Sequence, residues 1–263
     1  MTVRSRVYRA GTEARYPAIS QRGTLKPTHL VQILDEVSAG WWQETAGVDR
    51  WSYFERHRVR AVVRYVQAYT PPVRVLPGVP LDAELAVTLG TDRRGWYGGH
   101  DELTLRAADG TVVAVWTSRW TWLDTDAGAR PAPRTEAPPG FGGEPPLLPE
   151  LPRRPRSGGT ETAGFTFSDR ETDLNDHVFF ACYLERGENA LADAGVPPGR
   201  TDTSRCWYLR PARAGQSITP AVTGTAHGHV VELRLGAGGF PAAVCEYTST
   251  AEQDRAGSEA GPG

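Results

Sequence analysis

The chain has 263 residues, and its 29 lysines and arginines nearly balance its 31 aspartates and glutamates, for a formal net charge of −2. With its charges so balanced, the chain has no net positive electrostatic potential that would attract nucleic acid or an anionic membrane. We therefore expect neither as a partner. The residues after Met1 alternate between polar and apolar types and form no long apolar run, which predicts a cytoplasmic protein.

The first half of the chain predicts a short strand, one helix and a run of strands. Apolar residues recur at the spacing of one buried helical face, at Leu30, Ile33, Leu34, Val37 and Trp41. Pro27 stands near the start of this helix, where a missing N–H costs nothing. Turn signals such as Asp109-Gly110 separate the strands that we expect at 59–69, 83–91, 102–107 and 111–123.

A stretch dense in proline and glycine then divides the chain. Neither a helix nor a strand ladder persists in such a composition, which predicts a surface linker. The final residues are polar, Ala, Gly and Pro, and predict a disordered tail. We therefore expect an N-terminal domain at 1–126, a linker at 127–160, a C-terminal domain at 161–250 and a tail at 251–263.

The second half repeats the order of the first. A strand at 163–168 precedes a helix that should begin near His177, with an apolar stripe at Phe180, Tyr183, Leu184, Gly187 and Leu191. Strands are then expected at 205–209, 217–225, 230–235 and 242–248. One long helix on a curved antiparallel sheet of about five strands, made twice, is an α+β fold.

A carboxylate, an amide and an imidazole come close together in the sequence at Asp173, Asn175 and His177. They stand at the step from a strand into a helix, where they can converge without any long-range pairing. Asp and Asn are also common turn and N-cap residues, so a capping role is the plain structural alternative.

The segment Asp173-Leu174-Asn175-Asp176-His177-Val178, with Tyr183 beyond it, resembles the Asp-x-Asn-x-His-Val signature of acyl-ACP thioesterases. Thr24 to Gly47 resembles the first helix of those enzymes, and Trp122-Leu123-Asp124 with Arg130-Pro131 resembles the end of their first hotdog. The resemblance implies a double hotdog fold and hydrolysis of an acyl thioester carried by acyl carrier protein or coenzyme A. It also implies a place in fatty acid or polyketide biosynthesis, no cofactor, and a monomer or homodimer.

Two features depart from that family. Where the family continues His-Val-Asn-Asn, this chain has Phe179 and Phe180 after Val178, so two amides are replaced by apolar rings. The position that matches a family Glu on the next strand is Pro211. These changes keep open a dehydratase acting on a carrier-bound intermediate, and a non-catalytic protein that only binds the acyl chain.

The resemblance assigns roles to individual residues. Asp173 and His177 would orient and deprotonate water, and Asn175 would hold the water or the thioester carbonyl. Phe179 and Tyr183 would bind substrate. Glu36 lies where single-hotdog thioesterases often keep a catalytic acid, and it is a secondary candidate.

Metal and nucleotide sites are not expected. The remaining histidines are scattered, and the cysteines, Cys182, Cys206 and Cys245, share no close spacing. We expect them to be reduced, half-buried thiols. A glycine-rich phosphate-binding motif is also absent from the sequence.

Overall fold

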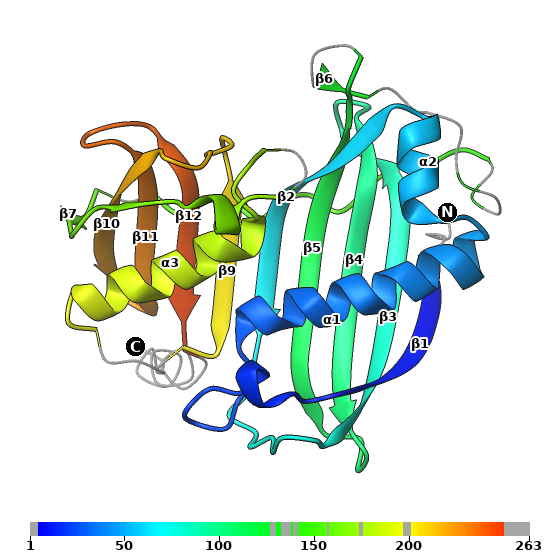
Figure 1. Cartoon of the computed structure of the whole chain (residues 1–263), viewed down its shortest axis with the longest axis horizontal. Coiled ribbons are helices and arrows are strands. Elements are labelled where there is room, and N and C mark those ends of the chain that lie inside the picture. The colour runs from blue at the N-terminus through cyan, green and yellow to red at the C-terminus, as the bar shows by residue number, and fades with distance from the viewer. Residues whose placement is uncertain are drawn as a thin grey trace, which may run out of the picture. The chain divides into compact units, whose positions relative to one another are not determined.

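The computed structural model of the chain describes residues 5–126, 130–132, 138, 141, 143–156, 158–173, 176–196 and 201–249. They fold into two compact units. The first is drawn from 1–66 and 73–152, and the second from 67–72 and the residues from 153 onward. In each unit one long helix lies across one face of a sheet (Figure 1). The predicted α+β arrangement, made twice, is confirmed.

The first sheet follows the predicted strands closely. Its strands lie in the order β1 (Ser5–Glu13), β3 (Pro80–Thr91), β4 (Tyr97–Ala107), β5 (Val112–Asp124) and β2 (Val59–Tyr69), with the short β6 (Arg130–Pro131) against β5. The pairs from β1 to β5 are antiparallel. β4 begins five residues earlier than the predicted strand at 102–107, which brings Asp101 into the sheet.

The long helix of the first unit is α1 (Pro27–Gly40). All five residues of its predicted stripe are buried, from Leu30 to Trp41. Trp41 lies just past the helix, in a π-helical turn (Trp41–Ala46), which is followed by α2 (Arg50–Arg56). The side chain of Asp49 caps α2 by accepting the Ser52 N–H at 2.8 Å. A single 3-10 turn (Tyr16–Ala18) precedes α1.

Aromatic residues fill the space between these helices and the first sheet. Trp116, Trp120 and Trp122 are buried on one face of β5, as their alternate spacing predicts. The ring of Trp122 lies 4.8 Å from that of Tyr97 on β4 and 5.5 Å from that of Tyr53 on α2, measured between centroids. This contact identifies the face of the sheet that the helices cover.

Part of the predicted linker packs with the first unit. The Leu148 side chain is buried, and its N–H donates to the Thr91 carbonyl oxygen at 2.8 Å. The Thr91 N–H donates in turn to the Pro146 carbonyl oxygen at 3.0 Å. Proline and glycine prevent a regular strand here, but these bonds still attach the segment to β3.

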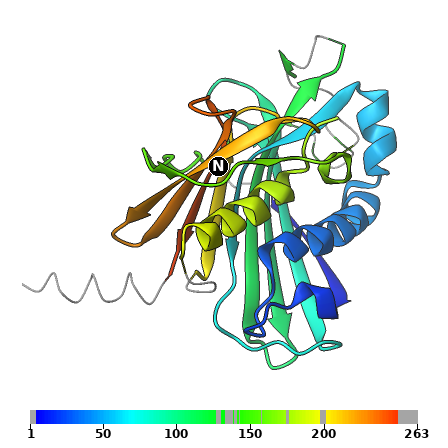
Figure 2. The ribbon, with the colours of Figure 1, turned by 60° about the vertical axis from the view of Figure 1, so that its left-hand side comes forward.

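The second sheet has the order β9 (Thr203–Tyr208), β12 (Pro241–Thr248), β11 (Gly228–Leu235), β10 (Ser217–Thr225) and β7 (Thr160–Glu161). The short β8 (Phe165–Thr166) also pairs with β10, so the strand expected at 163–168 is shorter than predicted. α3 (Phe180–Asp193) lies across this sheet (Figure 2). A Cβ at Gly187 would collide with the Tyr247 hydroxyl, which explains a glycine on the buried stripe.

The helix of the second unit begins at Phe180 and not near His177, which corrects the prediction. Residues before it are held in another conformation, because Thr172 and Val178 form an antiparallel bridge. Within the described residues, every helix is too short or too polar to cross a bilayer. Cys182 is half-buried as expected, whereas Cys206 and Cys245 are completely buried, and all three are free thiols.

Candidate active site

Two of the predicted catalytic residues, Asp173 and His177, face each other across a hairpin turn that precedes α3. The Asp173 N–H donates to the His177 carbonyl oxygen at 2.8 Å, and the Asp176 N–H donates to the Asp173 carbonyl oxygen at 3.1 Å. Asp176 closes the turn with φ of 58°, a left-handed conformation that Asp tolerates better than most residues. The hairpin makes Asp173 and His177 neighbours across two short chain segments.

The hairpin is anchored by backbone bonds on both sides. The Val178 N–H donates to the Ala212 carbonyl oxygen at 2.8 Å, and the Phe179 N–H donates to the Glu171 carbonyl oxygen at 2.7 Å. The Val178 side chain is buried. Because Ala212 lies in the loop after β9, the sheet fixes the position of His177.

Glu171 holds the start of the hairpin. Its carboxylate accepts the Ser168 N–H at 2.8 Å and pairs with the Arg186 guanidinium of α3 at 2.8 Å. Burial alone would raise the pKa of Glu171, but the bonds from Ser168 and Arg186 outweigh this and lower it. Arg186 is thereby half-buried and links the helix to the hairpin.

The first turn of α3 has no side-chain cap. Its N-cap residue is Phe179, which offers no oxygen to the N–H groups that begin the helix. Most helices place Ser, Thr, Asp or Asn there. The start of α3, three residues after His177, therefore presents the positive end of the helix dipole without a side-chain cap.

Aromatic rings surround this helix start. Phe179 and Phe180 are both half-buried, with ring centroids 4.7 Å apart. The Tyr208 hydroxyl donates to the Phe180 carbonyl oxygen at 2.9 Å. Phe180 is thus less buried than its place on the predicted stripe implies.

Tyr183 is buried and its hydroxyl is already engaged. The Ala212 N–H donates to the Tyr183 hydroxyl oxygen at 3.0 Å. Burial raises the pKa of Tyr183 to about 12, and the negative charge of Asp173 acts in the same direction. Tyr183 therefore supports the loop after β9, and its contact with a substrate stays a prediction.

Two of the candidate residues stand apart from this group. Asn175 lies outside the described residues, so its role stays a prediction. Glu36 lies on α1 in the first unit, is exposed, and pairs with Arg15 at 3.6 Å. Pro211 is exposed beside Ala212.

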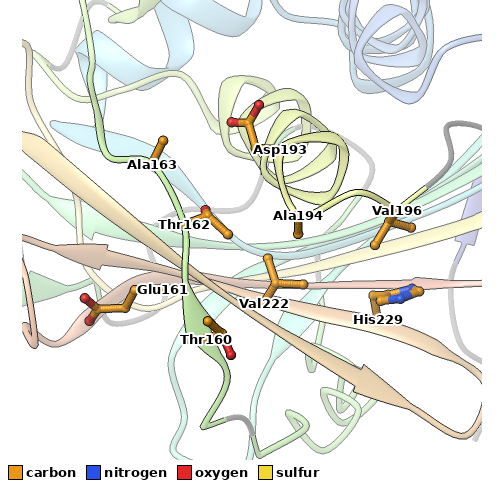
Figure 3. A pocket seen from close by; sticks show the side chains of 9 residues that line it. All are labelled: Thr160, Glu161, Thr162, Ala163, Asp193, Ala194, Val196, Val222 and His229. Carbon is orange, nitrogen blue, oxygen red and sulfur yellow. The ribbon is translucent and has the colours of Figure 1, made fainter.

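A recess of about 750 Å³ lies at the other end of α3. Figure 3 shows its lining side chains, which include Asp193 and Ala194 at the end of the helix, Val222 on β10 and His229 on β11. A helix of 14 residues is ~20 Å long, so the recess is far from His177. None of the predicted site residues lines it.

No protein-family model matches the sequence, and no curated protein matches it either. Solved structures do match. An acyl-ACP thioesterase from Bacteroides thetaiotaomicron has a TM-score of 0.74 at 12% identity, over 92% of this chain and 97% of that one. The 12:0-ACP thioesterase from Umbellularia californica has a TM-score of 0.71 at 14% identity, over 92% and 96%. The fold is a double hotdog.

A second enzyme class has this fold. A MaoC-like dehydratase from Phytophthora capsici matches with a TM-score of 0.56 at 12% identity, over 94% of this chain and 97% of that one. Among the residues that the structure describes, no three His, Cys, Asp or Glu side chains gather into a possible metal site. Solved structures from two enzyme classes thus share this fold.

One polar group of this double hotdog was not predicted. Asp101 on β4 accepts hydrogen bonds from Ser118 and Trp120 on β5, on the face that the helices cover. The signal was present in the sequence, because Asp101 is in phase with the buried Leu103 and Leu105. Our expected strand began one residue too late to include it.

Proposed function

We propose that the protein hydrolyses acyl thioesters carried by acyl carrier protein or coenzyme A. The observation that carries the proposal is the backbone hydrogen bond between Asp173 and His177 just before the uncapped start of α3. A base with an orienting carboxylate, next to the positive end of a helix dipole, is the set of groups that this reaction needs. The double hotdog fold supports the same reaction.

In the proposed reaction the His177 imidazole takes a proton from water. The water oxygen attacks the thioester carbon, and its C=O electrons move to the oxygen. When the tetrahedral intermediate collapses, the C–S bond breaks and the thiolate leaves, taking up a proton. Asp173 orients the imidazole and stabilises its positive charge. The products are a carboxylic acid and the thiol of the carrier.

When water attacks, the thioester oxygen becomes a negatively charged oxyanion. We place it at the start of α3, where the helix dipole favours a negative charge. The apolar rings of Phe179 and Phe180 keep bulk water away, which strengthens this electrostatic interaction. Phe179 is proposed to line the mouth of the acyl site, and Asn175 to hold the water or the carbonyl. Glu36 is kept as a secondary acid.

A dehydratase is the second candidate. The match with the MaoC-like dehydratase favours it, as does Pro211 in place of a family carboxylate. One imidazole and one carboxylate are sufficient to remove water from a β-hydroxyacyl group. A non-catalytic acyl-binding protein is the third possibility, and fatty acid or polyketide biosynthesis is the proposed setting for all three.

The test is to incubate the full chain with acyl-carrier and acyl-CoA thioesters of varied chain length, including β-hydroxyacyl members. Free thiol is measured with a colorimetric assay, and the acyl group is measured by mass spectrometry. Thioesterase activity releases thiol, whereas dehydration removes one water and leaves the thioester intact. Binding without either change supports the non-catalytic alternative and overturns the hydrolase.

A further inference from the structure

The recess at the end of α3 has no part in the proposed reaction. All of its lining residues belong to the second unit, at the end of α3 and on the sheet side at β7, β10 and β11. Its volume of about 750 Å³ lies within the range of small-molecule sites, which is roughly 300–1,000 Å³. The recess is therefore large enough for a small organic ligand.

The middle of the recess is apolar. Ala194 at the end of the helix and Val222 on β10 lie there, and Val196 continues the apolar wall (Figure 3). Two carboxylates, those of Asp193 and Glu161, flank this middle part on different sides (Figure 3). A ligand that fits this lining has a hydrocarbon body and polar ends.

The Asp193 carboxylate lies at the negative end of the α3 dipole. The helix is described along its whole length, and its last turn contains no basic residue. Asp193 is exposed, and within the described part of the chain its carboxylate has no hydrogen bond or ion pair. This side of the recess therefore favours a positive charge.

The charge of Glu161 is only weakly compensated. Its Oε1 accepts the Arg234 Nη1–H and the Gly238 N–H, each at 3.4 Å. Arg234 makes a shorter bond to Glu232, at 2.7 Å, so two carboxylates share one guanidinium. The Glu161 side chain is also 42% exposed, which leaves it accessible to a cation.

The wall between the two carboxylates contains a hydroxyl group without a partner. Thr162 follows β7 and lines the recess, and among the described residues nothing bonds to its buried Oγ1. A buried hydroxyl without a hydrogen bond costs free energy, which a ligand with N–H groups would recover. Figure 3 shows Thr162 between Glu161 and Asp193.

Charge and shape together select the ligand. A carboxylate or phosphate would be repelled by Asp193, Glu161 and the end of the helix dipole. A metal ion does not fit, because among the described residues no three His, Cys, Asp or Glu side chains gather. A monoamine pairs with one carboxylate and leaves the other unused. A linear diamine pairs with both, and its methylene chain covers the apolar middle.

We propose that the recess binds a free aliphatic diamine or polyamine. One ammonium group pairs with Asp193 at the end of α3, and another pairs with Glu161. The methylene chain between them lies over Ala194 and Val222. The site is separate from the hairpin that contains His177, so the ligand binds whether or not the proposed hydrolysis takes place.

The test follows backbone amide signals of the full chain by NMR while diamines are added, from 1,3-diaminopropane to 1,8-diaminooctane. Each is compared with the monoamine and the alcohol of the same chain length. Titrations are run at low salt and about pH 8, where imidazoles such as that of His229 are ordinarily neutral and aliphatic amines are ordinarily charged. Thermal unfolding confirms that each variant is folded.

Four variants are titrated. Asp193→Asn and Glu161→Gln each remove one proposed partner. Ala194→Lys places an ammonium group in the recess at an exposed position, where a cation near the end of a helix does not destabilise it. The matched control is Glu185→Gln, which removes an exposed carboxylate from the same helix but outside the recess.

The inference predicts that one diamine binds about threefold or more tightly than its monoamine, and that the alcohol binds more weakly still. Asp193→Asn and Glu161→Gln should each weaken binding by about threefold, in line with exposed ion pairs. Ala194→Lys should abolish binding, and Glu185→Gln should retain it. Diamines that bind no more tightly than monoamines at every length, signal changes confined to other regions, or unchanged binding in Ala194→Lys would overturn the inference.

Discussion

Asp173 and His177 close the same turn, with the Asp173 N–H 2.8 Å from the His177 carbonyl oxygen. This bond brings the backbones of the two residues together before α3. The outer bonds from Val178 to Ala212 and from Phe179 to Glu171 then attach the turn to the second sheet and to α3. The backbone around the proposed base is therefore held by hydrogen bonds on both sides.

The first prediction concerns the base and its partner. His177→Ala and Asp173→Asn should each lower kcat by about 10²-fold or more, in line with the effect of general acid–base groups. Both side chains lie outside the buried core, so the unfolding temperature should hardly change. Steady-state kinetics and thermal unfolding check this. Full activity in both variants would assign the chemistry to another residue, with Glu36 the next to test.

The uncapped helix start gives a second prediction. Phe179→Asn supplies a side-chain cap to α3, whereas Phe179→Ala removes the ring without adding one. The asparagine variant should be more stable than the alanine variant by about 1 kcal/mol, because Asn is among the best N-cap residues. Its kcat should nevertheless be lower, since the capping side chain occupies the place at the helix start that is proposed for the oxyanion.

Urea unfolding and kcat are measured for both Phe179 variants. A higher kcat for Phe179→Asn than for Phe179→Ala would show that the helix start is not used in the reaction. The predicted role of Phe179 at the acyl site is checked with the same proteins, by comparing bulky with linear acyl chains.

The bond between Glu171 and Arg186 gives a third prediction. Glu171→Gln removes a charge from a half-buried pair and should cost about 1–3 kcal/mol of unfolding free energy. Because the pKa of Glu171 is lowered in the fold, its contribution is complete above its unfolded pKa and is lost as the pH falls through the lower folded value. The hairpin also loosens, so kcat should fall as well.

A matched control separates the two effects. Glu232 and Arg234 form a comparable pair at 2.7 Å on β11, away from the hairpin. Glu232→Gln should lower stability by a similar amount with kcat unchanged. Equal losses of kcat in Glu171→Gln and Glu232→Gln would mean that Glu171 has only a structural role.

A fourth prediction follows from the charge of Asp101. Its pKa is raised from 3.8 to about 6, so between these values the folded chain binds the proton more tightly than the unfolded chain. This residue therefore makes the fold less stable as the pH rises from 4 to 6, by about 2–3 kcal/mol in total. Asp101→Asn should remove that loss.

Urea unfolding at about pH 4 and pH 7.5 measures the effect of Asp101. The stability of Asp101→Asn relative to the unsubstituted protein should increase with pH, whereas the exposed Asp82→Asn should show no such change. The same difference at both pH values would mean that the Asp101 carboxyl is not desolvated.

The periodic elements could be predicted from the sequence because their signals are local. The stripe from Leu30 to Trp41 and the alternation of Trp116, Trp120 and Trp122 each report one buried face. The start of α3 could not be predicted in this way. It depends on Ala212, which is distant in sequence and accepts the Val178 N–H.

The candidate site was predicted only in part. The spacing of Asp173 and His177 predicted a shared turn, and their catalytic grouping stays a prediction, whereas the uncapped start of α3 and the bond from Glu171 to Arg186 required tertiary contacts. The π-helical turn and α2 were also missed, because Trp42, Tyr53 and Phe54 are held there by contacts between rings. The spacing of apolar residues along the sequence does not predict such contacts.

The most direct test of the central claim is hydrolysis of a long-chain acyl-carrier thioester in water labelled with oxygen-18. Thioester hydrolysis by attack of water predicts one equivalent of free thiol for each carboxylic acid, and one labelled oxygen in that acid. His177→Ala should release both at a rate at least about 10²-fold lower. An acyl group that stays on its carrier, whether unchanged or lighter by one water, would contradict the account.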